Sequence, residues 1–332
     1  THWTTDIYDQ SMFYQACLNL AEMFQSLKQQ QKAKEWRNEA QAIQKNTNRW
    51  LWQKDKGFYK VHIHLDSLRH DFDENEIFPM GGNAQAMISG LADKIKSVQI
   101  IENALERQKS FSVSTISGTL LPPYPKDFFK HPLLDDPYEY QNGAQWDWFG
   151  GRLIAAMFEQ GFSKQARNKL IEIIRKNKMN KGFFEWDNRE GIGQGSDYYC
   201  GSAGSLGKAL FEGYFGIQLA RDSLLLAPKL GEDEANVHFY LPANDFFIAY
   251  DYRFSPKEKK ITLDYNSNIP VSGKIKILIP EILNSPASEE KNFEVLWNRS
   301  EFPFTLKRIN QDTFITIETD FQRHTLEIRL RK

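Results

Sequence analysis

The sequence contains little cysteine: among 332 residues only Cys17 and Cys200 occur, far apart and without the spacing of metal ligands. They give no sign of a cysteine-bound metal, and they do not indicate a cellular compartment. Long apolar runs are also lacking. None approaches the roughly 20 residues that a bilayer span needs, so we expect no membrane partner.

The chain likewise has no excess of charge of one sign. It carries 42 basic and 43 acidic residues, for a net charge of −1, and no basic stripe stands out along it. Because such a chain has no field that would attract an anionic polymer, we expect no nucleic-acid partner.

Aromatic residues, in contrast, are abundant. They make up 14% of the chain, with eight Trp and thirteen Tyr, and they concentrate in loops between helical stretches. The flat C–H faces of a pyranose lie against aromatic rings, while sugar hydroxyls bind amide and carboxylate side chains. This mixture favours a carbohydrate ligand, although we expect many of the rings to pack in ordinary cores.

Apolar residues recur at helical spacing through the first two thirds of the chain. They predict helices at 9–28, 32–50, 83–90, 93–108, 146–160, 163–177 and 203–214. Between the second and third, residues 55–57 predict a tight turn flanked by short extended segments. Residues 121–137 predict a long loop of the kind that carries function. Helices joined alternately by short turns and long aromatic loops are typical of a ring of repeated hairpins.

After Gly216 the pattern changes to short, β-rich stretches separated by Pro, Asn, Gly and Asp. Strands are predicted at 223–226, 237–241, 246–254, 260–265, 274–279, 293–297, 313–318 and 324–330. Together they predict an antiparallel β-sandwich. The sequence thus predicts a multi-domain α and β protein, with a helical domain at 1–216 and a sandwich at 217–332.

The densest group of polar and aromatic residues lies at 138–151, where a loop is predicted to enter a helix. Asn142, Gln145 and Asp147 offer donors and acceptors beside the indoles of Trp146 and Trp148. We expect these five residues to bind sugar. The alternative is that Asp147 is a carboxylate of the first helical turn and that the two indoles are packing residues.

A second group, at 182–199, holds Glu185 between aromatic residues, ahead of a glycine-rich loop. Such surroundings desolvate a carboxylate and tune its pKa, which suits a catalytic base. Trp186 and Tyr198 are expected to contact sugar nearby. Asp187 and Glu190 lie nearer the predicted turn and are expected to be solvated.

The N-terminal segment 1–10 is a short aromatic and acidic loop that leads into the first helix. Trp3 and Tyr8 are candidate sugar contacts there. Asp9 is expected to cap the helix. Asp6 lacks so ready a structural role and is a candidate general acid.

Histidine and acidic residues elsewhere give weaker signals. His62 and His64 share one face of an extended segment, but no third metal ligand is evident near them. The acidic run at 71–76 is expected to be solvated, with Glu74 or Glu76 as candidates for bordering a cleft.

In their order and spacing these groups resemble the six-hairpin glycosidases, the (α/α)6-toroid clan that includes processing α-glucosidase I, glucoamylases, α-rhamnosidases and glycogen-debranching glucosidases. After the acidic aromatic loop, the matching motifs are Leu-Trp…Gly-Phe-Tyr at 51–59, Asn-Gly-Ala-Gln-Trp at 142–146, Phe-Phe-Glu-Trp at 183–186 and Ser-Ala-Gly at 202–204. The resemblance covers residues 1–216, and the terminal sandwich resembles those that follow the toroid in several of these families.

The resemblance implies a glycoside hydrolase with an inverting acid/base mechanism, α-glycosides favoured, that needs no metal or organic cofactor. Glu185 matches the general base, and Asp6 is the best match to the general acid. Aromatic walls would come from Trp3, Trp146, Trp148 and Trp186.

The seven helices correspond to the sixth through twelfth of the toroid. This implies a partial toroid: the chain is a fragment of a longer protein, or a partner such as the missing N-terminal half completes the ring. The general acid could then lie ahead of Thr1 instead of at Asp6.

Three alternatives remain open. A carbohydrate phosphorylase of the same fold would use phosphate in place of water and would not need a base at Glu185. A polysaccharide lyase would want a His-Tyr pair and a basic groove, which the sequence does not offer. A non-catalytic carbohydrate-binding fragment is expected if half of the ring is truly absent.

Overall fold

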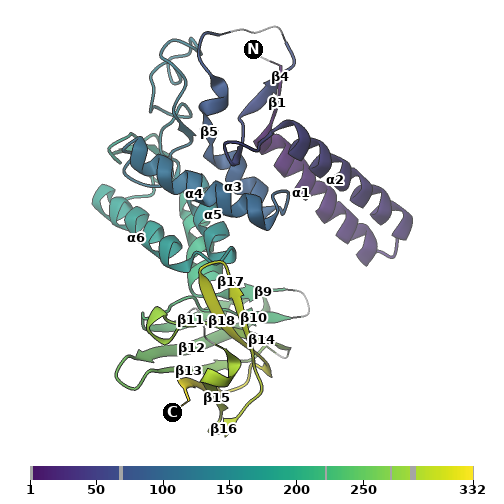
Figure 1. Ribbon diagram of the computed structural model, residues 1–332, viewed down its shortest axis with the longest axis vertical. Helices are drawn as coiled ribbons and strands as arrows, with labels where there is room; N and C mark the ends of the chain where they lie inside the picture. The colour runs from purple at the N-terminus through teal and green to yellow at the C-terminus, as the bar shows by residue number, and fades with distance from the viewer. Residues whose placement is uncertain (1–2, 67–69, 221–222, 270, 285–288, 332) are drawn as a thin grey trace. The chain divides into compact units, whose positions relative to one another are not determined.

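The computed structural model describes residues 3–66, 70–220, 223–269, 271–284 and 289–331 (Figure 1). The chain divides into two compact units. The first comprises residues 1–160 and 166–209, and the second comprises 161–165 and 210–332. The short segment 161–165 therefore belongs to the second unit, which the sequence pattern did not indicate.

All seven predicted helices are present. They are α1 (Ile7–Ser26), α2 (Gln30–Trp50), α3 (Met80–Ile88), α4 (Lys94–Ser110), α5 (Asp147–Glu159), α6 (Ser163–Asn180) and α7 (Cys200–Lys208). A π-helical turn, η2 (Ala209–Tyr214), continues α7. Helices α1 and α2 pack side by side as the predicted hairpin (Figure 1). Among the described residues, no helix is long and apolar enough to cross a bilayer.

Four short strand pairs hold the loops of the first unit. They are β1 (Thr4–Asp6) with β4 (His62–His64), β2 (Trp52–Gln53) with β3 (Phe58–Tyr59), β5 (Phe78–Pro79) with β6 (Leu120–Leu121), and β7 (Trp186–Asp187) with β8 (Gly193–Gln194). The turn predicted at 55–57 joins β2 and β3. It ends at Gly57, whose φ of +74° is strained for other residues.

The second unit contains two β-sheets packed around a common apolar core. Its strands are β9 (Ile217–Leu219), β10 (Leu224–Leu226), β11 (Ala235–Leu241), β12 (Phe246–Ser255), β13 (Lys260–Ser267), β14 (Ser272–Leu278), β15 (Phe293–Trp297), β16 (Ser300–Glu301), β17 (Thr305–Ile309), β18 (Asp312–Asp320) and β19 (His324–Leu330). One sheet has the order β17-β18-β14-β10-β9 and the other β11-β12-β13-β19-β15-β16.

The eight predicted strands of this unit all form, and neighbouring strands run antiparallel except for the parallel pair β10 and β14. The alternating pattern on β14 places Ile275 and Ile277 in the core, where both are fully buried. Alternation of this kind arises because successive side chains of a strand project to opposite faces.

Candidate active site

Backbone hydrogen bonds join the two polar, aromatic groups of the helical unit. The amide of Gln145 donates to the carbonyl of Asp187 at 2.9 Å, and the amide of Asp187 donates back to Gln145 at 2.8 Å. The loop that enters α5 therefore lies directly beside the β7–β8 hairpin. The predicted sugar-binding group and the group that contains the predicted base, Glu185, therefore come from neighbouring segments.

Asn142 and Gln145 are fully buried. Asn142 Oδ1 accepts from the amide of Tyr124 at 2.8 Å, and its Nδ2 donates to the carbonyls of Tyr124 and Leu134. Gln145 Oε1 accepts from the amide and hydroxyl of Thr115, while its Nε2 donates to the carbonyl of Asn188. Both side chains hold loops in place, and their contact with sugar stays a prediction.

Asp147 and Asp187 share one buried cation. Lys176 Nζ lies 2.9 Å from Asp147 Oδ2 and also donates to Asp187 Oδ2. Asn177 Nδ2 and the Ser117 hydroxyl also donate to the Asp147 carboxylate, at 2.8 and 2.9 Å, and Asn180 Nδ2 donates to Asp187 Oδ1 at 2.9 Å. Asp147 starts α5 as the alternative interpretation proposed, but the expectation of a solvated Asp187 was wrong, since it is 1% exposed.

Burial raises the pKa of Asp187 to about 6; the ammonium of Lys176 opposes this shift and the charge of Asp147 adds to it. Two carboxylates facing one ammonium leave an excess negative charge in a place that water does not reach. Holding a proton on one of the carboxylates removes that charge.

Glu185 is half-buried at the base of the glycine-rich loop. Its amide donates to the carbonyl of Ser196 at 2.8 Å, and the amide of Ser196 lies 3.4 Å from Glu185 Oε2. Gly195 has a φ of +69°, and a Cβ there would lie 2.5 Å from the same carboxylate oxygen. The glycine therefore leaves the room in which the Glu185 carboxylate sits.

Asp6 ends β1 and is the N-cap of α1, where its carboxylate accepts the amide of Asp9 at 2.8 Å. The expectation that Asp9 caps the helix was wrong: Asp9 lies in the first turn, and the nearby charge of Asp6 is the main cause that raises its pKa. An Asn or Asp at this position stabilises a helix by satisfying an amide that has no intrahelical partner. Asp6 thus has a structural role of its own.

The predicted aromatic contacts differ in exposure. Trp3 and Tyr198 are 74% and 85% exposed, whereas Trp146 is only 3% exposed and its Nε1 donates to the carbonyl of Tyr140. Trp186 is half-buried beside the Tyr140 ring. The rings of Trp3 and Tyr198 are therefore accessible to a ligand, whereas the ring of Trp146 packs in the interior, as the alternative interpretation proposed.

Arg152 connects Tyr8 and Trp148, two of the predicted contacts. Its guanidinium lies 4.8 Å from the Trp148 ring centre, and its Nη1 donates to the Tyr8 hydroxyl at 2.9 Å and to Gln85 Oε1 at 3.2 Å. The sequence interpretation missed Arg152. Its position four residues after Trp148, on one helix face, was the available signal.

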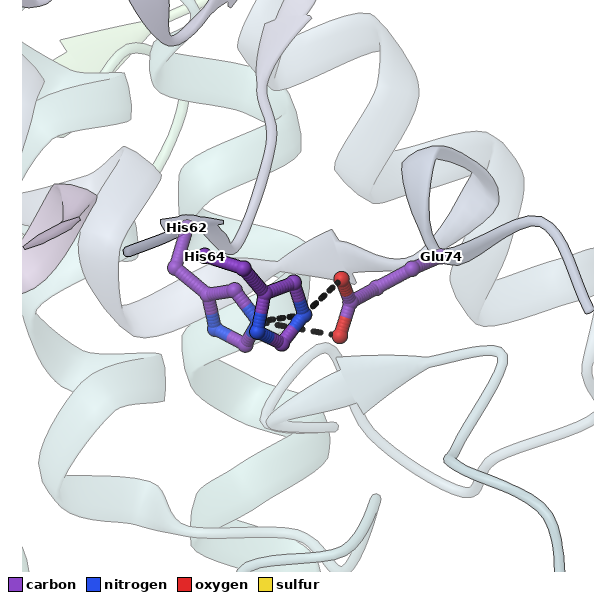
Figure 2. Close-up of side chains that lie close together, drawn as sticks. All are labelled: His62, His64 and Glu74. Atoms are coloured by element: carbon purple, nitrogen blue, oxygen red, sulfur yellow. Dashed lines mark hydrogen bonds and ion pairs between the residues drawn. The ribbon is translucent and has the colours of Figure 1, made fainter. Parts of the chain in front are cut away.

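His62, His64 and Glu74 converge, so the expectation that no third ligand accompanies the histidines was wrong. Figure 2 shows both rings on the side of the Glu74 carboxylate. Burial raises the pKa of Glu74, but hydrogen bonds from His62, Tyr124 and His64 outweigh it and lower the pKa to about 2. The chemistry of this cluster, two imidazoles and a carboxylate, is that of a transition-metal site.

The fold is similar to that of known glycosidases. An α-L-rhamnosidase from Dictyoglumus thermophilum matches 95% of this chain at 11% identity and a TM-score of 0.61, and this chain covers 31% of that one. A GH78-family rhamnosidase from Bacillus sp. GL1 matches 85% at 14% identity and a TM-score of 0.57, with 28% of that chain covered. The chain thus spans less than one third of the length of either enzyme.

A GH63 mannosylglycerate hydrolase from Thermus thermophilus also matches, over 63% of this chain and 46% of that one, at 16% identity and a TM-score of 0.47. No family model matches the chain, and neither does any curated protein sequence. The identities are low, so the likeness concerns the fold. The helical hairpins and the following β-sheets of this chain are similar in fold to part of these rhamnosidases, in agreement with the resemblance drawn from the motifs.

Proposed function

We propose that this protein acts in the hydrolysis of glycosidic bonds in oligo- or polysaccharides, with α-glycosides favoured and inversion at the anomeric carbon. The observation that carries the proposal is Glu185: a half-buried carboxylate held beneath Gly195, next to aromatic rings, on a fold similar to that of rhamnosidases. Fold alone does not define an activity, so the argument depends on this site.

In the proposed mechanism Glu185 is the general base. Its ionised carboxylate takes a proton from a water molecule, which attacks the anomeric carbon. A general acid on the opposite face gives a proton to the leaving oxygen, and the two carboxyl groups of such a pair lie roughly 6.5–9.5 Å apart. Asp6 is the proposed acid. Sugar rings would lie against Trp3, Trp148, Trp186 and Tyr198.

The non-catalytic alternative also has an observation in its favour. The chain spans only 31% of the length of the similar rhamnosidase, and Asp6 already serves as a helix cap. A segment equivalent to the remaining helices, in a longer form of the protein or in a partner, would be needed to complete a toroid. In this alternative the aromatic residues bind carbohydrate without cleaving it.

The test is to purify the longest natural form and to incubate it with α-linked gluco-, manno- and rhamno-oligosaccharides, with and without phosphate. We expect release of a sugar of inverted anomeric configuration that does not require phosphate. NMR of the product identifies its anomer. Phosphate-dependent release would identify a phosphorylase, and binding without turnover would favour the non-catalytic alternative.

Glu185→Gln is the decisive variant. Removal of a general base lowers turnover by roughly 100-fold or more, while the amide keeps the size and the hydrogen-bonding capacity of the side chain. The matched control is Glu190→Gln, because Glu190 is exposed and belongs to the same loop. Asp187→Asn is unsuitable as a control, since Asp187 belongs to the buried network with Lys176.

A further inference from the structure

Three side chains that can bind a metal converge in the helical unit. His62 Nε2 and His64 Nε2 lie 3.1 Å apart, His62 Nε2 lies 2.9 Å from Glu74 Oε1, and His64 Nε2 lies 2.9 Å from Glu74 Oε2. All three side chains are largely shielded from solvent, with 12–18% of their side-chain surface exposed. Figure 2 shows this triangle of two nitrogens and a carboxylate.

The backbone fixes this convergence. His62 and His64 are two residues apart on β4, so both rings project from the same face of the strand. Glu74 lies in a single 3-10 turn, η1 (Glu74–Glu76), which the Asp73 side chain caps. The Tyr124 hydroxyl donates to Glu74 Oε1 at 2.5 Å and holds the carboxylate in its orientation.

The spacing between the imidazole nitrogens and the carboxylate oxygens fits a metal ion. Zinc binds imidazole nitrogen at about 2.0–2.1 Å and carboxylate oxygen at about 2.0–2.2 Å, so that two ligands of a tetrahedral ion are roughly 3.3 Å apart. Separations of 2.9–3.1 Å are close to this value. Two imidazoles exclude calcium and magnesium, which take oxygen ligands.

Without a metal, the cluster can form only if both Nε2 atoms carry protons and donate to Glu74. A lone pair on either nitrogen would face the carboxylate at 2.9 Å and be repelled. A cation at the centre accepts both lone pairs and the carboxylate together. Ligands in metal sites are also held by outer hydrogen bonds, and the Tyr124 hydroxyl supplies such a bond to Glu74.

A further histidine lies beside the cluster, with a nitrogen placed as a fourth ligand. His70 Nε2 lies 3.5 Å from Glu74 Oε2, and His70 Nδ1 lies 3.0 Å from the carbonyl of Phe72. Donation from Nδ1 to that carbonyl places a lone pair on Nε2, which is the tautomer of a metal ligand.

We propose that His62, His64 and Glu74 bind a transition-metal ion, Zn²⁺ by preference, with the remaining position open to water or to His70. This site is separate from the proposed chemistry at Glu185, and its test does not depend on hydrolysis. The ion would tie β4 to the segment 70–76. It would also hold β1, because Asp6 pairs with His62 in the strand register.

The experiment uses the untagged 332-residue chain, stripped with a chelator and titrated with Zn²⁺ in competition with a chromogenic chelator. We expect one ion per chain and a rise in Tm, because an ion that binds only the folded state stabilises it. Co²⁺ should give visible absorption bands typical of nitrogen and oxygen ligands. Absence of stoichiometric binding in the wild-type chain would overturn the proposal.

Variants then assign the ligands. His64→Gln and Glu74→Gln should each weaken binding by more than the roughly 100-fold that loss of an outer partner causes, and should abolish the rise in Tm on adding Zn²⁺. His238→Gln is the matched control, since His238 is an exposed histidine of β11. Equal Zn²⁺ affinity in the wild type and in both ligand variants would disprove the assignment. If one variant folds poorly, the cobalt spectrum of the wild type still tests it: a spectrum without nitrogen ligands would contradict the proposal.

Discussion

The ammonium of Lys176 lies 2.9 Å from the carboxylate of Asp147, and both side chains are buried. Asp187 contacts the same ammonium, so a single positive charge on α6 serves two carboxylates from other segments. The network joins the start of α5 to the β7–β8 hairpin, which directly follows the proposed base. Breaking a buried pair costs far more than a surface pair is worth, because it leaves an uncompensated charge.

Lys176→Ala is therefore expected to lower the free energy of unfolding by about 3–5 kcal/mol. The measurement is urea denaturation followed by circular dichroism. Lys178→Ala is the control, since Lys178 is exposed on the same helix and its loss should change stability by less than about 0.5 kcal/mol. A similar, small effect in both variants would show that the buried pair does not hold the loops together.

Asp187 gives the network a pH dependence. Its pKa is raised from 3.8 to about 6, first by burial, so the folded state binds this proton more tightly than the unfolded state. The resulting stability is fully present below about pH 4 and is lost as the pH rises through about 6.

Between about pH 4 and pH 8, the free energy of unfolding of the wild type should fall by up to about 3 kcal/mol relative to that of Asp187→Asn, which has no titratable group at this position. Denaturation midpoints at several pH values measure the difference. Asp197→Asn, an exposed neighbour, should follow the wild type. Parallel pH profiles for the wild type and Asp187→Asn would contradict the shift.

The helices and most strands of the second unit could be predicted because their apolar residues recur regularly over many positions. In the second unit the strands missed were β9, β16 and β17, and all three lie at an edge of their sheet. An edge strand pairs on one side only and is often short and polar. Ser300 and Glu301 of β16 are exposed, so they leave no apolar alternation to detect.

The site was harder to predict because its contacts are long-range. Gln145 and Glu185 could be selected by composition. Helical spacing from Leu170 and Ile173 places Lys176 on the buried face of α6, but it does not show that the ammonium meets Asp147 and Asp187, which come from other segments. His62 and His64 were visible as a pair on one face. Their partner Glu74 sat in an acidic run typical of solvent-exposed segments, and only the tertiary fold brings it to them.

Gly195 gives a prediction that rests on the proposed function. Its φ of +69° costs an alanine roughly 1–2 kcal/mol, and the added Cβ would lie 2.5 Å from Glu185 Oε2. Gly195→Ala should therefore displace the carboxylate and lower hydrolysis by about tenfold or more while the chain remains folded.

The control for this change is Gly204→Ala. Gly204 is exposed inside α7, and a Cβ added there would have no neighbouring atom within 4 Å. Alanine there should raise the free energy of unfolding by about 0.5–1 kcal/mol and leave hydrolysis unchanged. Unaltered turnover in Gly195→Ala would mean that the position of Glu185 does not limit the reaction.

Asp6 can be tested so that its two roles separate. Asp6→Asn keeps a side-chain oxygen that accepts the Asp9 amide, and Asn caps helices about as well as Asp. Asp6→Ala loses the cap and should cost about 1 kcal/mol of stability. If Asp6 is also the general acid, both variants should lose hydrolysis by roughly 100-fold or more, since neither side chain has an acidic proton to give. Thermal denaturation and product release, measured together, distinguish the roles: a fully active Asp6→Asn would leave Asp6 as a helix cap alone and place the general acid on another residue.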